Sequence, residues 1–179
     1  AFELGYRGSI KGFNFDVNYN TENSGEWTNL PNGDRVWRIS FYSENAQTLN
    51  FLLQNYQLAE GSYLFFYNED KSVVLGSFNH LNNVVHKNLS TMPIPGSKIT
   101  LEFYEPSYAK NKSTFSITRV THGYRSLKIN TKDVGDSGNC NNNVICAVGD
   151  NWRDQIRSVG IIIVGGSGIC TGSLINNTC

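Results

Sequence analysis

Apolar and polar residues alternate with a period of two in several short stretches of this 179-residue chain. In residues 12–19 every odd position is apolar, and every even position is polar or glycine. Such alternation places one set of side chains on each face of a β-strand, so it favours sheets with one buried face. The apolar faces that this pattern predicts carry Phe13, Phe15, Val17 and Tyr19; Trp37, Ile39 and Phe41; Leu49, Phe51 and Leu53; and Tyr63, Phe65 and Tyr67.

Further strand candidates follow at 72–78, 98–104, 114–120 and 124–129. Turn signals rich in Pro, Asn, Gly and Asp separate them, and no segment has the long pattern of an amphipathic helix. Short strands joined by such turns predict a β-sandwich. We expect its core to include Trp37, Phe51, Phe65 and Leu101.

Charge and hydropathy exclude several classes of partner. Lys plus Arg and Asp plus Glu number 15 each, which argues against nucleic acid or an anionic membrane surface as a partner. The apolar runs, such as residues 161–164, are far too short to span a bilayer. His80, His86 and His122 lack metal-ligand spacing, and we expect neither metal nor cofactor. With no initiator Met or signal peptide at residue 1, we expect upstream processing.

The four cysteines all lie late in the chain, and the first 139 residues contain none. Clustered cysteines are typical of disulfides in an exported protein, whereas a zinc site remains the alternative. The tight C-x-x-C pairs of zinc sites are absent. Spacing alone does not choose among the three possible connectivities. The predicted disulfide cysteines are Cys140, Cys146, Cys170 and Cys179.

The strand-rich region offers no distinct catalytic constellation. Its carboxylates at Asp34, Glu44, Glu60, Glu69 and Asp70 fall in or near turns. Charged side chains there are expected to be solvated, so their presence requires no catalytic role. Aromatic side chains in strands are more often core than ligand platform, although Trp27 and Trp37 could also line a sugar-binding face. Taken alone, this region is predicted to be a binding or structural module.

Two parts of the chain resemble a known family. "GDSGNCN" (135–141), "VIC" (144–146), "GDNWRDQIRSVG" (149–160) and "CTGSLINNT" (170–178) resemble the start of the mature catalytic domain of lysyl endopeptidases, trypsin-like serine proteases. "GSYLFFYNEDKSVVLGSFNH" (61–80) and "PGSKITLEFYEP" (95–106) resemble the pro-region of bacterial secreted proteases of this kind, and also a CUB-type jelly roll. Around Gly165-Gly166-Ser167-Gly168 we expect a strand pair joined by a turn.

The "GDSG" at 135–138 resembles a catalytic-serine motif, but we expect Ser137 not to be a nucleophile. The triad order in trypsin-like proteases is His, Asp, Ser, and no histidine follows Ser137. We therefore expect no catalytic residue in this chain, which would stop before the triad. The resemblance implies propeptide cleavage at Lys132-Asp133, although these charges could equally belong to a solvated linker.

The sequence thus predicts an all-β protein with two regions. Residues 1–132 form a jelly-roll or CUB-like β-sandwich pro-region, and residues 133–179 form the first strands of an incomplete trypsin-like barrel. The resemblance implies a precursor secreted by a bacterium, inactive as this piece, whose partners are the rest of its protease domain and protein substrates. It also implies that Cys140, Cys146 and Cys170 pair with cysteines further along. The alternative is a non-enzymatic, secreted carbohydrate-binding or adhesion module.

Overall fold

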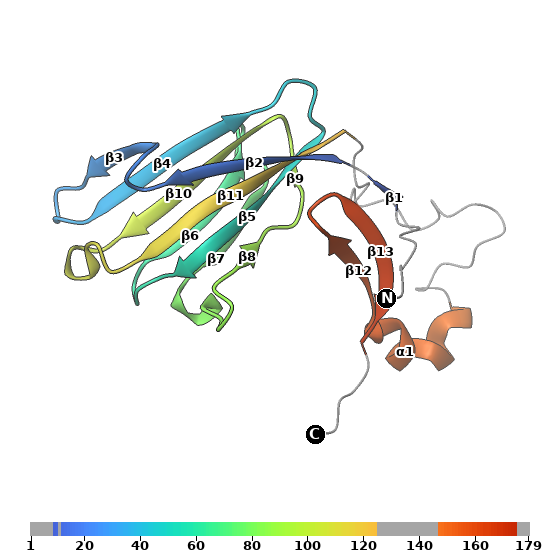
Figure 1. The fold of residues 1–179 in the computed structure, drawn as a ribbon. Helices are drawn as coiled ribbons and strands as arrows, with labels where there is room; N and C mark the ends of the chain where they lie inside the picture. Colours follow the sequence, from blue (N-terminus) through green and yellow to red (C-terminus); the bar gives the residue numbers. More distant parts are fainter. Residues whose placement is uncertain (1–8, 11, 125–146, 175–179) are drawn as a thin grey trace, which may run out of the picture.

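The computed structural model describes residues 9–10, 12–124 and 147–174. Within these ranges the chain forms a two-sheet β-sandwich and, beside it, a β-hairpin that follows a short helix (Figure 1). The all-β prediction is therefore confirmed. Two 3-10 helices, η1 (His80–Asn82) and η2 (Ser107–Ala109), lie in loops of the sandwich. None of the described helices is long and apolar enough to cross a membrane.

The sandwich consists of two antiparallel sheets whose strands match most of the predicted segments. The first sheet has the order β3-β4-β10-β6-β7, and the second has the order β2-β11-β5-β8, with β9 also paired to β5. The first sheet contains β3 (Glu26–Asn29), β4 (Arg35–Tyr42), β10 (Lys98–Glu105), β6 (Tyr63–Asn68) and β7 (Val74–Phe78). The second contains β2 (Gly12–Asn20), β11 (Thr114–Gly123), β5 (Thr48–Gln57), β8 (Leu89–Ser90) and β9 (Ile94–Pro95). The strand expected at 124–129 lies almost wholly outside the described residues.

The core lies between the inner faces of the two sheets. Trp37, Phe51 and Leu101 are buried there, which confirms three of the four expected core residues. Trp37 stands opposite Phe103 in the β4–β10 ladder, and residues opposed in an antiparallel pair share a face. The alternation in β4 and β10 therefore predicts the inner face of the first sheet correctly.

The expected buried face of β6 is wrong. Phe65 is only half-buried, whereas Leu64 and Phe66 are fully buried. The cause is the register with β10, in which Leu101 stands opposite Phe66. Because β6 is apolar at odd and even positions alike, its own alternation does not choose a face, and a shift of one residue would reverse it.

The expected burial along β2 is also largely wrong. Phe13 and Phe15 are 62% and 55% exposed, although they occupy the apolar phase of the alternation. β2 is the edge strand of its sheet. Only its later part reaches the core, where Val17 packs against the core cluster and the Tyr19 ring contacts Phe41. The alternation correctly predicts the strand, but the edge position decides how much of it is covered.

The hairpin forms a third, small sheet. Strands β12 (Val159–Val164) and β13 (Gly168–Ser173) pair in register around a turn at 165–167, as predicted. They follow the 3-10 helix η3 (Ala147–Trp152) and the helix α1 (Arg153–Ser158). An element that the sequence did not predict, β1 (Ser9–Ile10), pairs with β13 from the other side. The described residues contain no closed barrel, and in them the hairpin region forms only this three-stranded sheet.

Candidate functional site

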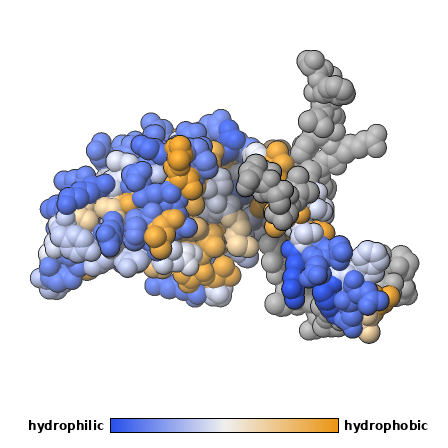
Figure 2. Space-filling model, turned by 90° about the horizontal axis from the view of Figure 1, so that it is seen from below, coloured by the Kyte–Doolittle hydropathy of each residue, from blue (hydrophilic) through white to orange (hydrophobic). Residues whose placement is uncertain are grey.

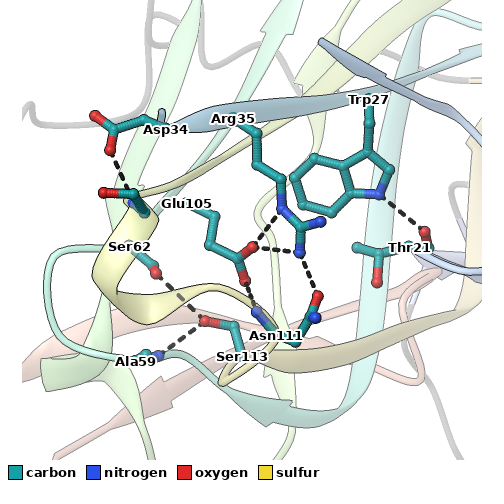
Figure 3. A network of polar contacts seen from close by, with 10 residues as sticks. Thr21, Trp27, Asp34, Arg35, Ala59, Ser62, Glu105, Asn111 and Ser113 are labelled. Carbon is teal, nitrogen blue, oxygen red and sulfur yellow. Dashed lines mark hydrogen bonds and ion pairs between the residues drawn. The ribbon is translucent and has the colours of Figure 1, made fainter. Parts of the chain in front are cut away.

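Two places in the structure gather polar side chains, and the first is a buried ion pair at one end of the sandwich. Arg35 and Glu105 stand opposite each other at the ends of β4 and β10, on the inner face. The Glu105 side chain is 2% exposed, and its Oε2 accepts from Arg35 Nε at 2.6 Å. Figure 3 shows how Asn111 closes the pair: its backbone N–H donates to Glu105, and its Oδ1 accepts from Arg35.

This ion pair also covers an aromatic ring. The Arg35 guanidinium carbon lies 3.8 Å from the centroid of the Trp27 ring, in cation–π geometry. The Trp27 indole N–H donates to the carbonyl oxygen of Thr21 (Figure 3). Trp37 has no exposed surface at all. The face of Trp27 toward Arg35 is therefore occupied, Trp37 is core, and the two rings do not form an open sugar-binding platform.

Asp34 lies close to the ion pair and overturns one prediction. Its carboxylate is buried and accepts hydrogen bonds from Tyr104 Oη at 2.5 Å and from the Ser107 backbone N–H at 2.8 Å. The hydrogen bond from Tyr104, followed by that from Ser107, lowers the pKa of Asp34. The expectation that solvation explains this turn carboxylate is wrong. Asp34 instead fixes η2 against the β3–β4 turn, and because both of its carboxylate oxygens accept hydrogen bonds, it has a structural role.

The histidines lie apart from one another, on η1, on the following loop and on β11. Among the described residues, no group of three or more His, Cys, Asp or Glu side chains is placed to hold a metal. His122 Nδ1 lies 2.7 Å from the Ser43 hydroxyl. In the described part of the chain no carboxylate bonds to His122, so the third group that would orient it as a general base is missing.

The second polar site joins the hairpin to the sandwich. Asn14, Thr121 and Asn50 stand directly opposite one another across β2, β11 and β5, on the outer face of the second sheet. We call these three residues the docking row. Asn14 Nδ2 donates to the Gly165 carbonyl oxygen at 2.7 Å, and Asn50 Nδ2 donates to that of Gly166 at 3.2 Å.

The docking row is itself held in place. The Thr121 hydroxyl donates to Asn14 Oδ1 at 2.8 Å, which leaves the Asn14 amide nitrogen to face the hairpin turn. Thr121 and Asn50 are buried, at 2% and 5% exposure, although the sheet face they occupy points away from the core. A pocket of about 230 Å³ lies beside the row, with Arg119 and Ile163 in its lining. No sequence motif marked these residues as a site, because their proximity arises from strand register.

The hairpin leaves its own apolar residues uncovered. Ile161 and Ile162 are 65% and 49% exposed, and they point to opposite faces of β12. β12 is also an edge, with β13 as its partner within the described residues. Seen from below, the sandwich surface is mostly hydrophilic with hydrophobic residues toward its middle (Figure 2). A strand that is apolar on both faces is typical of one buried from both sides.

Several predicted site residues cannot be placed. The segments at 125–146 and 175–179 are outside the described residues, and Cys170 belongs to β13, where it stands opposite Ile162 in the backbone register. The predictions for the remaining residues therefore stay predictions. They concern Lys132, Asp133, Ser137, Cys140, Cys146 and Cys179, and the disulfide expected of Cys170 also stays a prediction.

Residues 134–179 match the family model for "Lysyl endopeptidase, C-terminal domain". No solved structure matches the chain. The family match supports a protein related to lysyl endopeptidase and therefore related to proteases.

Proposed function

We propose that this chain is part of the precursor of a secreted, trypsin-like serine protease of the lysyl endopeptidase kind. Residues 1–132 are its pro-region, a jelly-roll or CUB-like sandwich, and residues 133–179 begin its catalytic domain. The observation that carries this proposal is where the family similarity starts, at residue 134, soon after the last sandwich strand ends at Gly123. Lysyl endopeptidases are typically secreted, and the clustered cysteines fit an oxidising compartment.

The geometry of the hairpin supports the same proposal. β12 exposes apolar side chains on both faces, as expected of a strand pair that belongs inside a larger β-structure. The rest of the protease domain is the partner that would cover it, and the substrates of the whole enzyme are proteins. The disulfides would then link Cys140, Cys146 and Cys170 to cysteines of that domain.

The decisive experiment is amino-terminal sequencing and intact mass measurement of the secreted protein. We expect maturation to release a catalytic domain whose first residue is Asp133, after cleavage at Lys132. A mature protein that still begins with the sandwich, or that lacks lysyl endopeptidase activity, would contradict the proposal. It would favour the alternative, a secreted binding module, although the partly covered Trp27 and the buried Trp37 give that alternative no aromatic platform.

Ser137 provides a sharper test of the same reading. The Ser137→Ala variant of the full-length protein should keep its turnover, because the nucleophilic serine of a trypsin-like protease follows the triad His and Asp along the chain, and no histidine lies between Ser137 and residue 179. The measurement is kcat/KM on a lysyl ester substrate, with the wild type as the control. A loss of several orders of magnitude would make Ser137 the nucleophile and overturn the assignment of "GDSG".

A further inference from the structure

The contact between sandwich and hairpin has features of a docking site. We propose that the docking row and β1 together hold the β12–β13 hairpin, so that the two regions stay associated after the chain between them is cut. The inference rests on the contact itself and does not require the second region to be a protease. The occupant is a defined segment of this chain, residues 159–173.

The docking row recognises the backbone of the turn. Two side-chain amides donate to two consecutive carbonyl oxygens, those of Gly165 and Gly166. Such bonds require a turn whose carbonyls face the sheet, and both glycines have positive φ, at 59° and 83°. Because Thr121 fixes the orientation of the Asn14 amide, the row is arranged to donate toward the turn.

The two glycines of the turn differ in how closely they approach the sandwich. A Cβ on Gly166 would lie 2.7 Å from Thr121 Oγ1, closer than real Cβ contacts allow. Thr121 cannot give way easily, since it is buried, β-branched and hydrogen-bonded to Asn14. A Cβ on Gly165 would meet nothing within 4 Å. Gly166 therefore makes the close contact, and Gly165 offers a matched control with the same backbone preference.

β1 adds a second, independent contact. Its residues pair with β13 as Ser9↔Ile169 and Ile10↔Gly168, on the side of β13 opposite β12. β1 ends only two residues before β2 enters the sandwich at Gly12, so this pairing fixes the hairpin next to the docking row. Adding a strand to an open sheet edge is a common way to bind an extended segment.

The contact should be dissociable rather than permanent. The 230 Å³ pocket beside the row shows that the hairpin does not fill the space against the sheet. While the chain is intact, the tether supplies an effective concentration of the order of millimolar. After the cut, association depends on protein concentration. The two regions should then separate on dilution, so cleavage makes their association reversible.

The test uses the full chain with a site-specific protease sequence inserted between Lys132 and Asp133. All four cysteines lie after the cut, so no disulfide can join the two pieces. We expect the cut wild type to migrate as one species in gel filtration at micromolar concentration and as two on dilution. Separation at every concentration would overturn the proposal, as would association that persists in the variants described next.

Two sets of variants locate the contact. Gly166→Ala should weaken association at least tenfold relative to Gly165→Ala, because both variants strain a positive-φ position but only the first adds a Cβ against Thr121. The isosteric pair Asn14→Asp and Asn50→Asp should separate the pieces, because carboxylates would face the turn carbonyls. Asn18→Asp, on the same face of β2, is their control. Unchanged tryptophan fluorescence would show an intact sandwich, in which Trp37 is fully buried. Equal behaviour of the two alanine variants would refute the docking role of Gly166.

Discussion

The sandwich and the hairpin contain similarly apolar strands, but the sandwich buries their side chains and the hairpin leaves them exposed. In the sandwich two sheets cover each other, and Trp37, Phe66 and Leu101 have no exposed surface. In the hairpin β12 is equally apolar, yet Ile161 is 65% exposed. Apolar strands therefore form a core only where a second layer of structure packs against them. Residues 12–124 supply both layers themselves, whereas residues 159–173 depend on neighbours for theirs.

The largest expected effect concerns the core of the sandwich. Phe66→Ala should lower the free energy of unfolding by about 3–5 kcal/mol, because it empties a fully buried site between the sheets. Phe65→Ala, at the neighbouring and half-buried position, is the matched control and should cost far less. Urea denaturation followed by tryptophan fluorescence measures both. Equal losses would mean that β6 does not present the even-numbered face to the core.

The buried ion pair comes next. Glu105→Gln should destabilise the sandwich by about 3 kcal/mol, because it leaves the Arg35 guanidinium desolvated without its charge partner. The control is Asp16→Asn, which breaks the Arg119–Asp16 pair where the Asp16 side chain is 77% exposed, and it should cost less than about 1 kcal/mol. Thermal and urea unfolding of the two variants would compare them. A loss at Asp16 as large as that at Glu105 would contradict the assigned burial.

Asp34 should make the stability of the sandwich depend on acidity. Its hydrogen bonds lower its pKa in the folded state below the ordinary value of 3.8. The stabilisation is therefore fully present above the unfolded pKa and is lost as the pH falls through the lower, folded pKa. The free energy of unfolding, measured between neutral pH and pH 2, should fall less with decreasing pH in Asp34→Asn than in the wild type. Identical pH profiles would refute the role of this carboxylate.

The smallest effect tests the hairpin directly. Ile161→Ala should change the stability of this chain by no more than about 0.5 kcal/mol, because the side chain is mostly exposed. Ile99→Ala makes the same chemical change at a fully buried site and should cost about 2–5 kcal/mol. In a longer protein whose further strands cover β12, the loss of unfolding free energy caused by Ile161→Ala should rise toward that caused by Ile99→Ala. A large loss at Ile161 in the present chain would show that β12 is already covered.

Some features of the candidate site could be predicted from sequence and others could not. The turn at Gly165-Gly166 is predicted by its glycines, which accept positive φ. The docking row is not predicted, because Asn14, Thr121 and Asn50 are ordinary polar residues on the solvent phase of three separate strands. Likewise, the sequence places Glu105 in a turn signal with Pro106, and only the strand register shows that Arg35 stands opposite it.

The sequence by itself determined where most of the longer strands and their turns form, because period-two alternation and residues such as Gly and Asp act locally on the backbone. It also determined the family similarity, which depends on an ordered run of residues from 134 to 179. Only the tertiary structure decided which face of β6 is buried, why Phe13 and Phe15 remain exposed, and that β1 pairs with β13. The physical reason is that alternation defines two faces of a strand but not its neighbours. Burial and pairing are set by register and layering between segments that can lie more than a hundred residues apart in the chain.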